Sequence, residues 1–293
     1  MKYYVLYNPL AGNGAFQNQV DALSSRLDGE TEYIDITKLQ SYEELFSAIR
    51  AEDTLILCGG DGTINRFVND TEGLSLPCDI LYFAAGTGND FLRDLEKNTD
   101  ETPLSIKKYL SDLPMVFVNG KQYRFLNNAG FGIDGYCCEV GDELKKVSSK
   151  PVNYTAIAIK GLLFHYHPTN AVITVDGTEY QYKKVWLAPT MKGRFYGGGM
   201  MAAPAQDRTD KNGSLSVMLF HGAGRLKTLM AFPSIFKGEH VKHTNMVAIH
   251  TGKDIHVKFD RPSPMQIDGE TISGVTEYHA TACVAIKAAN ITN

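Results

Sequence analysis

Long apolar runs and closely spaced cysteines are both missing from this chain. Lys160 interrupts the most apolar stretch, 154–164, so no segment approaches the roughly 18 residues of a membrane-spanning helix. The five cysteines form no Cys-x-x-Cys pair, which argues against a disulfide framework and suits a reducing cytoplasm. Positive charge is not in excess either: the net charge is −4, and we expect no broad nucleic-acid binding. We therefore expect a globular cytoplasmic protein.

Several catalytic signatures are also absent. No Gly-Lys pair precedes Ser or Thr, so there is no Walker A loop, and Gly12-Asn-Gly14 is not completed to Gly-x-Gly-x-x-Gly. Neither Gly-x-Ser-x-Gly nor His-Glu-x-x-His occurs. His240 and His243 have the spacing of a ligand pair, but nothing nearby completes a tetrahedral site. We expect them to be surface histidines near a basic stretch.

The most informative feature present is a short apolar run, 54–58, that leads directly into Gly59-Gly-Asp-Gly-Thr63 and then into an amphipathic segment. A turn with almost no side chains lets backbone N–H groups and the positive end of a helix face an anion. The enclosed carboxylate and the closing threonine favour a nucleotide or metal–phosphate site. A glycine-rich strand-to-helix turn without a ligand is the alternative interpretation.

The N-terminal part alternates strand and helix patterns. We predict strands at 3–7, 33–36, 54–58 and 79–84, with helical spacing of apolar residues between them, as at Phe16, Val20, Leu23 and Leu27. This alternation predicts a mostly parallel sheet covered on both faces. Ligands of such sheets gather beyond the carboxyl ends of the strands, where glycine-rich loops follow Tyr7, Cys58 and Ala84.

Past about residue 113 the pattern changes to an antiparallel one. Asn119-Gly120 and Asp176-Gly177 each separate two strand-like runs, as in β-hairpins. Apolar helical candidates at 154–164 and 226–236 lie between further strands, and Pro233 breaks the second helix. We predict an α/β nucleotide-binding domain at 1–113 and a β-rich substrate domain at 114–293, whose last strands pack back on the first domain.

Three loop motifs and several later landmarks belong together. The motifs are Tyr7-Asn-Pro-Leu-Ala-Gly12, Gly59-Gly-Asp-Gly-Thr63 and Gly86-Thr-Gly-Asn-Asp-Phe91 with Arg93; the landmarks are Pro189, Gly197-Gly-Gly-Met200, Pro204 and Gln266-Ile-Asp-Gly-Glu270. The set resembles the diacylglycerol-kinase catalytic family of bacterial soluble lipid kinases, related to sphingosine kinases. The resemblance implies an N-terminal α/β domain like that of NAD kinase and phosphofructokinase. It also implies a β-rich C-terminal domain, an antiparallel sandwich with inserted helices.

The resemblance implies transfer of the γ-phosphoryl group of ATP, with Mg²⁺, to a hydroxyl of diacylglycerol or a related lipid. Asp61 and Asp90 are expected to meet a Mg²⁺–phosphate unit, in part through waters. Asp90, with Asn89, also suits a helix N-cap. The residues expected to border the nucleotide are Asn8, Pro9, Gly12, Thr37, Gly59, Gly60, Asp61, Gly62, Thr63, Asn65, Gly86, Thr87 and Asn89.

The family's general base lies in the Asp-Gly-Glu motif, which places Asp268 in that role and Glu270 as the residue that orients it. From spacing alone Asp268 is a turn residue, because Asp28-Gly-Glu30 repeats the same tripeptide in an ordinary connection. Asp134, in another glycine-rich loop, is a weaker candidate that would join the site through water.

Two departures from the family pattern concern charge. Arg66 stands where the family has a Glu, and Asn212 stands where it has an Asp that helps to hold a structural Mg²⁺. An amide is a poorer ligand for a hard cation, so the second metal site is doubtful, although Asp210 lies close enough to substitute. Two alternatives to a lipid kinase stay open. One is a kinase of a soluble acceptor, in the manner of NAD kinase, and the other is a nucleotide-binding regulator that has lost catalysis.

A lipid acceptor requires a surface that approaches a bilayer. Candidates are 156–164 and 226–236, the second followed by Lys237, His240 and Lys242, while Phe195, Tyr196, Met200 and Met201 are candidates to line an acyl groove. Apolar helical stretches more often face a core. Any contact with the inner membrane face would be peripheral and strengthened by anionic lipid. Strand edges in the second domain are able to pair in a homodimer.

Overall fold

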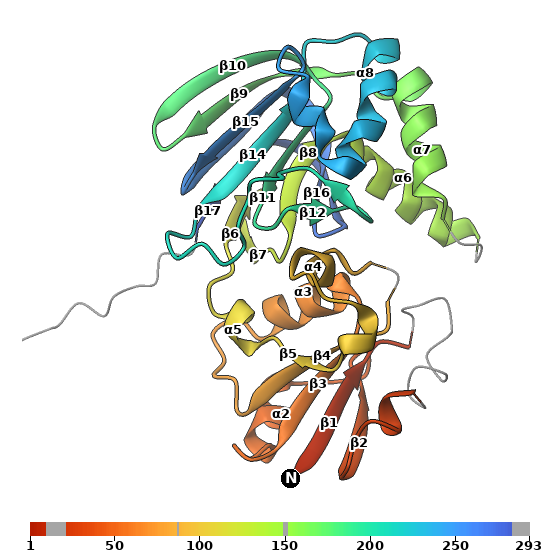
Figure 1. The fold of residues 1–293 in the computed structure, drawn as a ribbon, viewed down its shortest axis with the longest axis vertical. Helices are drawn as coiled ribbons and strands as arrows, with labels where there is room; N and C mark the ends of the chain where they lie inside the picture. Colours follow the sequence, from red (N-terminus) through yellow and green to blue (C-terminus); the bar gives the residue numbers. More distant parts are fainter. Residues whose placement is uncertain (10–21, 87, 149–151, 283–293) are drawn as a thin grey trace, which may run out of the picture.

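The computed structural model describes residues 1–9, 22–86, 88–148 and 152–282, which form two parts stacked along the long axis of the molecule (Figure 1). The N-terminal part is built on a five-stranded sheet in the order β2-β1-β3-β4-β5. The strands are β1 (Lys2–Tyr7), β2 (Glu30–Asp35), β3 (Thr54–Gly59), β4 (Asp79–Ala84) and β5 (Leu104–Ser105). All pairings are parallel except that of β5 with β4. The described helices of this part are α2 (Tyr42–Ala48), α3 (Asp61–Asp70), α4 (Asp90–Asp94) and α5 (Lys107–Leu110), with the 3-10 turn η2 (Thr99–Glu101).

Burial on both faces explains the apolar strands of this sheet. In β3, Leu55 and Leu57 pack into the cluster that includes Phe67 of α3, while Ile56 joins a separate cluster on the opposite face. Alternate residues of a strand point to opposite faces, so a sheet covered on both sides needs a continuous apolar run. The predicted strand–helix alternation and mostly parallel sheet are confirmed. The predicted helix face at Phe16 and Val20 lies outside the described residues.

The C-terminal part is a ten-stranded antiparallel sheet, in the order β15-β14-β11-β8-β16-β17-β6-β7, with the β9–β10 hairpin attached through β16. Its strands are β6 (Met115–Val118), β7 (Lys121–Arg124), β8 (Asn128–Gly132), β9 (Thr169–Val175), β10 (Thr178–Val185), β11 (Leu187–Met191), β14 (Leu215–Phe220), β15 (Val247–Gly252), β16 (Asp254–Ile267) and β17 (Glu270–Thr281). A separate short hairpin joins β12 (Phe195–Tyr196) and β13 (Met200–Met201). The expected β-rich domain is therefore antiparallel, as predicted.

Helical segments gather on one side of this part (Figure 1). They are α6 (Ile133–Val147), α7 (Tyr154–Lys160), the π-helical turn η3 (Gly161–His165), α8 (Arg225–Ala231) and the 3-10 turns η4 (Phe232–Lys237) and η5 (Glu239–Lys242). The change from α8 to η4 occurs one residue before Pro233, which cannot donate the next helical hydrogen bond. None of the described helices is long and apolar enough to cross a membrane.

Two hairpin predictions are confirmed and one surface prediction is wrong. Asn119-Gly120 and Asp176-Gly177 each combine two positive φ values, 50° and 73° in the first pair and 47° and 82° in the second, as a two-residue hairpin turn requires. His240, expected at the surface, is fully buried, and its Nε2 lies 3.0 Å from the carbonyl oxygen of Ala202. Its imidazole is enclosed because η5 folds back onto the chain after β13.

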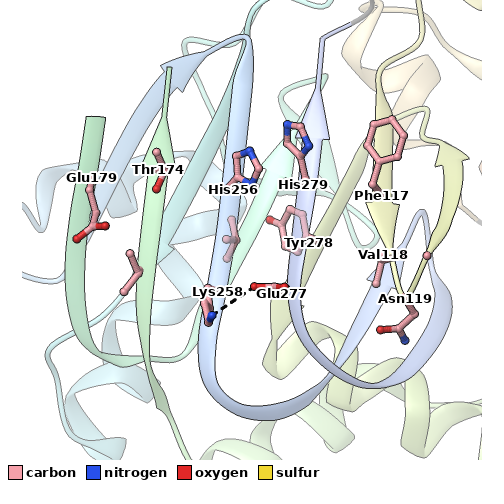
Figure 2. Close-up of a pocket in the computed structure, with 13 residues that line it drawn as sticks. Phe117, Val118, Asn119, Thr174, Glu179, His256, Lys258, Glu277, Tyr278 and His279 are labelled. Carbon is pink, nitrogen blue, oxygen red and sulfur yellow. Dashed lines mark ion pairs between the residues drawn. The ribbon is translucent and has the colours of Figure 1, made fainter. Parts of the chain in front are cut away.

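The exposed face of the large sheet carries a hollow of about 560 Å³ (Figure 2). Five neighbouring strands contribute side chains to it: Glu179, Thr174, His256, His279 and Phe117 come from β10, β9, β16, β17 and β6 in turn. This hollow is separate from the boundary between the two parts, where the predicted catalytic residues lie.

Candidate active site

The two glycine motifs of the N-terminal part contact each other backbone to backbone. The amides of Ala85 and Gly86 donate to the carbonyl of Gly59 at 2.9 and 3.1 Å, and the amide of Asp61 donates to the carbonyl of Gly88 at 3.0 Å. A Cβ atom on Gly86 would lie only 2.6 Å from the Cα of Gly60. Glycine is therefore required here because the β3–α3 and β4–α4 loops approach too closely for a side chain.

Open space lies beside the same two loops. A Cβ atom on Gly62 or Gly88 would meet no heavy atom within 4 Å. Gly62 belongs to the first turn of α3, a helix of ten residues whose N-terminus has the partial positive charge that favours phosphate. The loops thus combine tight mutual packing with room for a phosphate group beside the helix end.

Asp61 is buried in the first turn of α3, and its carboxylate binds the first backbone amides of the neighbouring helix, α4. Its Oδ2 accepts hydrogen bonds from the amide of Asp90 at 2.7 Å and from Nδ2 of Asn127 at 3.1 Å, and the amide of Phe91 also donates to its carboxylate. Burial, and then the nearby carboxylate of Asp90, raise the pKa of Asp61 to about 7. Asp61 is the side chain that caps α4.

Asp90 connects α4 with the C-terminal part. Its Oδ2 accepts from the amide of Gly198 at 2.7 Å, in the turn between β12 and β13, and its Oδ1 lies 3.9 Å from Nη1 of Arg93. Burial raises the pKa of Asp90 above its ordinary value. Asn89 occupies the N-cap position but makes no side-chain cap bond, and its amide instead pairs with Tyr82 and the carbonyl of Gly86.

Asp268 lies in the tight turn between β16 and β17, with a φ of 46° that a turn aspartate tolerates. Its carboxylate accepts from the amides of Leu126, Asn127 (2.8 Å) and Asn128 (3.0 Å), and from Nδ2 of Asn65 (2.7 Å) on α3. Burial raises the pKa of Asp268, while the three backbone donors act in the opposite direction. The turn therefore reaches the N-terminal part through Asn65.

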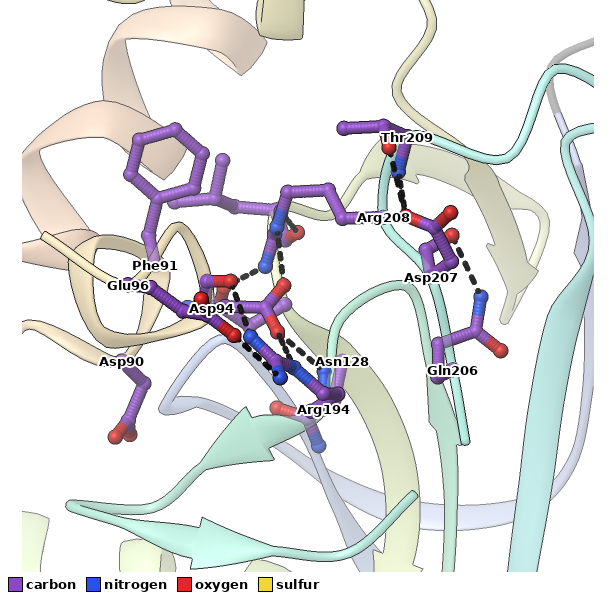
Figure 3. A network of polar contacts seen from close by, with 12 residues as sticks. Asp90, Phe91, Asp94, Glu96, Asn128, Arg194, Gln206, Asp207, Arg208 and Thr209 are labelled. Carbon is purple, nitrogen blue, oxygen red and sulfur yellow. Dashed lines mark hydrogen bonds and ion pairs between the residues drawn. The ribbon is translucent and has the colours of Figure 1, made fainter. Parts of the chain in front are cut away.

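Asn127 joins two of these aspartates. Its backbone amide donates to Asp268, and its side-chain amide donates to Asp61. Arg208 donates to its Oδ1 at 2.6 Å, which fixes the amide with its NH₂ group toward Asp61. The same guanidinium pairs with Asp94 of α4 at 2.7 Å, and Arg194 holds Asp94 from another side at 2.9 Å (Figure 3). A continuous polar network thus links Asp61 with Asp268 across the boundary between the two parts.

Neither Asn127 nor Arg208 was assigned a role from the sequence. Asn127 is one of two adjacent asparagines before a glycine-rich stretch, a composition that ordinary loops share. Arg208 lies in a polar segment with no motif around it. Their importance arises from contacts with residues 66 and 114 positions away, respectively, which no local pattern encodes.

The remaining predicted residues differ in exposure. Glu270, predicted to orient Asp268, is exposed at the start of β17. The hydrogen bonds to the Asp268 carboxylate described above come instead from Asn65 and three backbone amides. Thr37 is exposed and bonds through its amide and hydroxyl to Asp35. Thr63 is buried, and its backbone amide donates a hydrogen bond to the carbonyl of Gly60. Asn8 and Pro9 directly follow β1. Gly12 and Thr87 lie outside the described residues.

Two metal sites were predicted, one at Asp61 and Asp90 and one at Asn212. Among the described residues, neither the Asp61–Asp90 pair nor Asp210 with Asn212 belongs to a group of three acidic, His or Cys side chains with converging ligand atoms. Asn212 is exposed, and its amide donates to Asp210 at 3.0 Å. Asp61, Asp90 and Asp268 nevertheless place three carboxylates at one boundary, a charge that suits a hard cation bound partly through water and phosphate oxygens.

Asp134, the weaker candidate, is buried in the first turn of α6. It accepts from Nε2 of Gln266 at 3.0 Å and from the amide of Gly135 at 2.9 Å. Burial raises the pKa of Asp134 to about 6. Gln266 lies near the end of β16, and its Oε1 accepts from the amide of Gly269 at 3.0 Å, so Gln266 links Asp134 to the turn that carries Asp268.

Comparisons with known proteins agree with this geometry. Residues 2–113 match the model of the diacylglycerol kinase catalytic domain, and residues 127–288 match that of the YegS C-terminal NAD kinase beta sandwich-like domain. A diacylglycerol kinase of Mycobacterium tuberculosis is 27% identical over 269 residues, 88% of this chain and 85% of that protein. A diacylglycerol kinase of Bacillus subtilis is 25% identical over 281 residues, 91% of this chain and 88% of that protein.

A crystal structure of a diacylglycerol kinase from Bacillus anthracis is similar in fold, with a TM-score of 0.60 at 20% identity, over 96% of this chain and 94% of that one. The two family models together cover most of the chain, and the second alone covers more than half. The expected family, fold class and enzyme class are confirmed. The chain belongs to the diacylglycerol-kinase-like lipid kinases, which are phosphotransferases.

Proposed function

We propose that this protein transfers the γ-phosphoryl group of ATP, with Mg²⁺, to a hydroxyl group of diacylglycerol or a closely related lipid. The observation that carries the proposal is the polar network that connects Asp61, Asp90 and Asp268, from three distant segments, at one boundary. Phosphoryl transfer needs a positioned phosphate, neutralisation of its charge and a base near the acceptor hydroxyl. The three carboxylates and two glycine loops supply groups of these kinds.

The nucleotide phosphates fit beside the β3–α3 and β4–α4 loops. Gly62 and Gly88 leave space there, and the N-terminus of α3 favours negative charge. Asp61 and Asp90 are the residues that would hold Mg²⁺, in part through water. When bound, the ion would neutralise phosphate charge during transfer. A nearby cation also favours the ionised form of Asp61, opposing the burial that raises its pKa.

Asp268 is the group that takes the proton of the lipid hydroxyl. Its two oxygens receive four hydrogen bonds, about the number that a carboxylate can accept. One donor must therefore leave before the carboxylate can bind the acceptor hydroxyl. Three donors are backbone amides fixed by the chain, whereas Asn65 is a side chain that can rotate away. Asn65 lies on the same helix as Asp61, so it couples the nucleotide loop to the base.

Phosphorylation of a panel of acceptors tests the proposal. Purified protein, Mg²⁺ and γ-labelled ATP are incubated with diacylglycerol, phosphatidylglycerol, sphingosine, undecaprenol or NAD, and labelled products are separated by solvent extraction. We expect label in the organic phase with diacylglycerol or a related lipid. Label on NAD alone would contradict the lipid assignment and identify a soluble acceptor. Saturable ATP binding without transfer to any acceptor would identify a catalytically impaired regulator.

We also propose that the helical side of the C-terminal part contacts the membrane that holds the lipid. Phe164 on η3 and Leu226 and Met230 on α8 are 67%, 70% and 75% exposed. The two elements contact each other, so these side chains come from adjoining elements. Exposed large apolar groups of this kind mark interaction surfaces. Lys160 at the end of α7, Lys227 on α8 and Lys237 at the end of η4 are exposed on these or adjoining elements, which favours anionic lipid.

Sedimentation with vesicles tests this contact. The triple variant Phe164→Ser, Leu226→Ser, Met230→Ser should bind phosphatidylglycerol-containing vesicles roughly 100-fold more weakly, since each of the three lost apolar contacts costs about 1 kcal/mol. Phe117→Ser, which removes an exposed aromatic side chain from β6, should bind as wild type does. Activity toward a short-chain, water-soluble diacylglycerol should survive in both variants. Equal binding of wild type and triple variant at low salt would refute the contact.

A further inference from the structure

A cluster of two histidines and an aspartate lies on the exposed face of the large sheet, at one edge of the hollow shown in Figure 2. His256 of β16 and His279 of β17 are direct cross-strand partners. Their chain neighbours Ile255, Val257 and Ala280 are fully buried, so the two histidines point to the opposite, solvent-exposed face. Strand register, rather than loop conformation, therefore holds the pair together.

The two imidazole rings lie almost parallel, with centroids 3.7 Å apart and planes 12° apart. Both present Nε2 to the same carboxylate: Asp254 Oδ1 lies 3.2 Å from His256, and Asp254 Oδ2 lies 2.9 Å from His279. Asp254 precedes His256 by two residues on β16 and so shares its face. Each of the three residues offers one ligand atom, and in the described part of the chain these three atoms all lie within 4.8 Å of one another.

These separations suit coordination of a metal ion. Metal–nitrogen and metal–oxygen bonds of about 2.0–2.2 Å at a tetrahedral angle place ligand atoms about 3.3 Å apart. The observed 2.9 and 3.2 Å are His–Asp hydrogen-bond distances, so an ion that replaces the shared protons needs only small shifts of the ligand atoms. Two imidazoles and one carboxylate favour Zn²⁺ and similar transition metals over Mg²⁺ and Ca²⁺, which prefer oxygen ligands. Three protein ligands leave one position for water.

The two imidazoles must tilt toward each other to share one ion, because nearly parallel rings direct their Nε2 lone pairs along parallel lines. Phe117 on β6 flanks His279, with ring centroids 5.7 Å apart, and limits the rotation of that imidazole from the side away from His256. The next pair on the same face of these two strands is Lys258 with Glu277, at 3.5 Å, so this lysine is already paired with a carboxylate (Figure 2).

We propose that Asp254, His256 and His279 form a binding site for one Zn²⁺-like divalent ion. The ion would cross-link β16 and β17 at the end of the hairpin opposite to its turn, which carries Asp268. The site is independent of the proposed phosphoryl transfer, because none of its residues contacts the network around Asp61. It stabilises the strand pair that presents the base to the boundary.

Calorimetric titration of tag-free, EDTA-treated protein with ZnCl₂ at pH 7.5 tests the site. We expect one saturable site per chain and a higher melting temperature with Zn²⁺, neither affected by millimolar Mg²⁺ or Ca²⁺. Asp254→Asn and His279→Gln should each weaken binding at least about tenfold, since even outer groups of metal sites cost 10- to 100-fold. His165→Ala, a change of an exposed histidine outside the cluster, should bind as wild type does.

The two ligand variants distinguish loss of binding from loss of structure. Asp254 is half exposed, so Asp254→Asn should fold with a Zn²⁺-free melting temperature close to that of wild type. No saturable binding by wild type, or binding that both ligand variants retain in full, would overturn the proposal. In that case the cluster would be only an Asp–His ion-pair group.

Discussion

At the scale of single residues, Asp61 combines a structural contact with an unfavourable charge. Its carboxylate caps α4 through the amides of Asp90 and Phe91, but it is buried beside a second carboxylate. The pKa near 7 means that the folded protein holds a proton on Asp61 between about pH 4 and pH 7, where the unfolded chain has released it. The contribution of Asp61 to stability therefore falls as the pH rises through that range.

Replacement of Asp61 by Asn should make this cost visible. The Asn oxygen can still accept from the amide of Asp90, while the buried charge is gone. Without nucleotide or Mg²⁺, the melting temperature of Asp61→Asn relative to wild type should be higher at pH 8 than at pH 5. Each kcal/mol corresponds to about 2–4 °C in a protein of this size. Scanning calorimetry at both pH values measures it; a difference that does not change with pH would refute the assignment. Kinase activity should fall at least about 100-fold.

At the scale of elements, the contact between the two glycine loops sets the position of α3 relative to α4. Gly60 and Gly86 approach so closely that the loops share hydrogen bonds and leave no volume for a methyl group. The chain pairs two strand-to-helix turns in this way because β3 and β4 are adjacent and parallel. The carboxylates of Asp61 and Asp90 come together through this pairing.

Gly86→Ala should therefore separate the loops. A methyl group 2.6 Å from the Cα of Gly60 forces the backbone to move, at a cost of about 1–3 kcal/mol in unfolding free energy, together with loss of most of the kinase activity. Gly88→Ala is the matched control, since its Cβ would meet open space and should leave stability within about 0.5 kcal/mol. Denaturant unfolding of both variants provides the comparison. Equal stability of the two would contradict the close-contact argument.

The elements also show how far the sequence alone was informative. The continuous apolar run of β3 and the two Asn-Gly and Asp-Gly hairpins were predictable, because burial on both faces and positive φ angles leave local signals. Convergence of the glycine loops followed from parallel strand order. The capping of α4 by Asp61 was not foreseen: Asn89 and Asp90 were the expected cap residues, and the capping group comes from 29 positions earlier. The buried position of His240 was missed because its contact, the carbonyl of Ala202, is also distant in sequence.

At the scale of the whole molecule, the candidate site depends on contacts between the two parts. Asp94 of α4 is held by Arg194 and Arg208 of the C-terminal part, and Asn65 bonds to Asp268 across 203 positions of sequence. Family motifs indicated Asp268, but neither Asn127 nor Arg208 carries a local signal. The confirmed predictions are the fold class, the family and the enzyme class. The nucleotide, the metal ion, the acceptor and the residue roles stay predictions.

The central claim is that Asp268 acts as the base in a site that it shares with Asp61 and Asp90. Asp176→Asn is a matched control, because Asp176 lies in a similar Asp-Gly turn, with φ angles of 47° and 82°, at the end of β9. In Asp268→Asn, the new NH₂ group faces fixed amide donors, so melting temperature and ATP affinity are measured alongside activity to show that the nucleotide loops stay folded.

The decisive measurement is the initial rate of phosphoryl transfer from ATP to diacylglycerol by wild type, Asp268→Asn and Asp176→Asn. The account predicts a rate roughly 10²- to 10⁴-fold lower for Asp268→Asn, the usual effect of losing a general base, with an ATP Kd within about threefold of wild type and full activity in Asp176→Asn. A folded Asp268→Asn protein that phosphorylates diacylglycerol within a few-fold of the wild-type rate would contradict it.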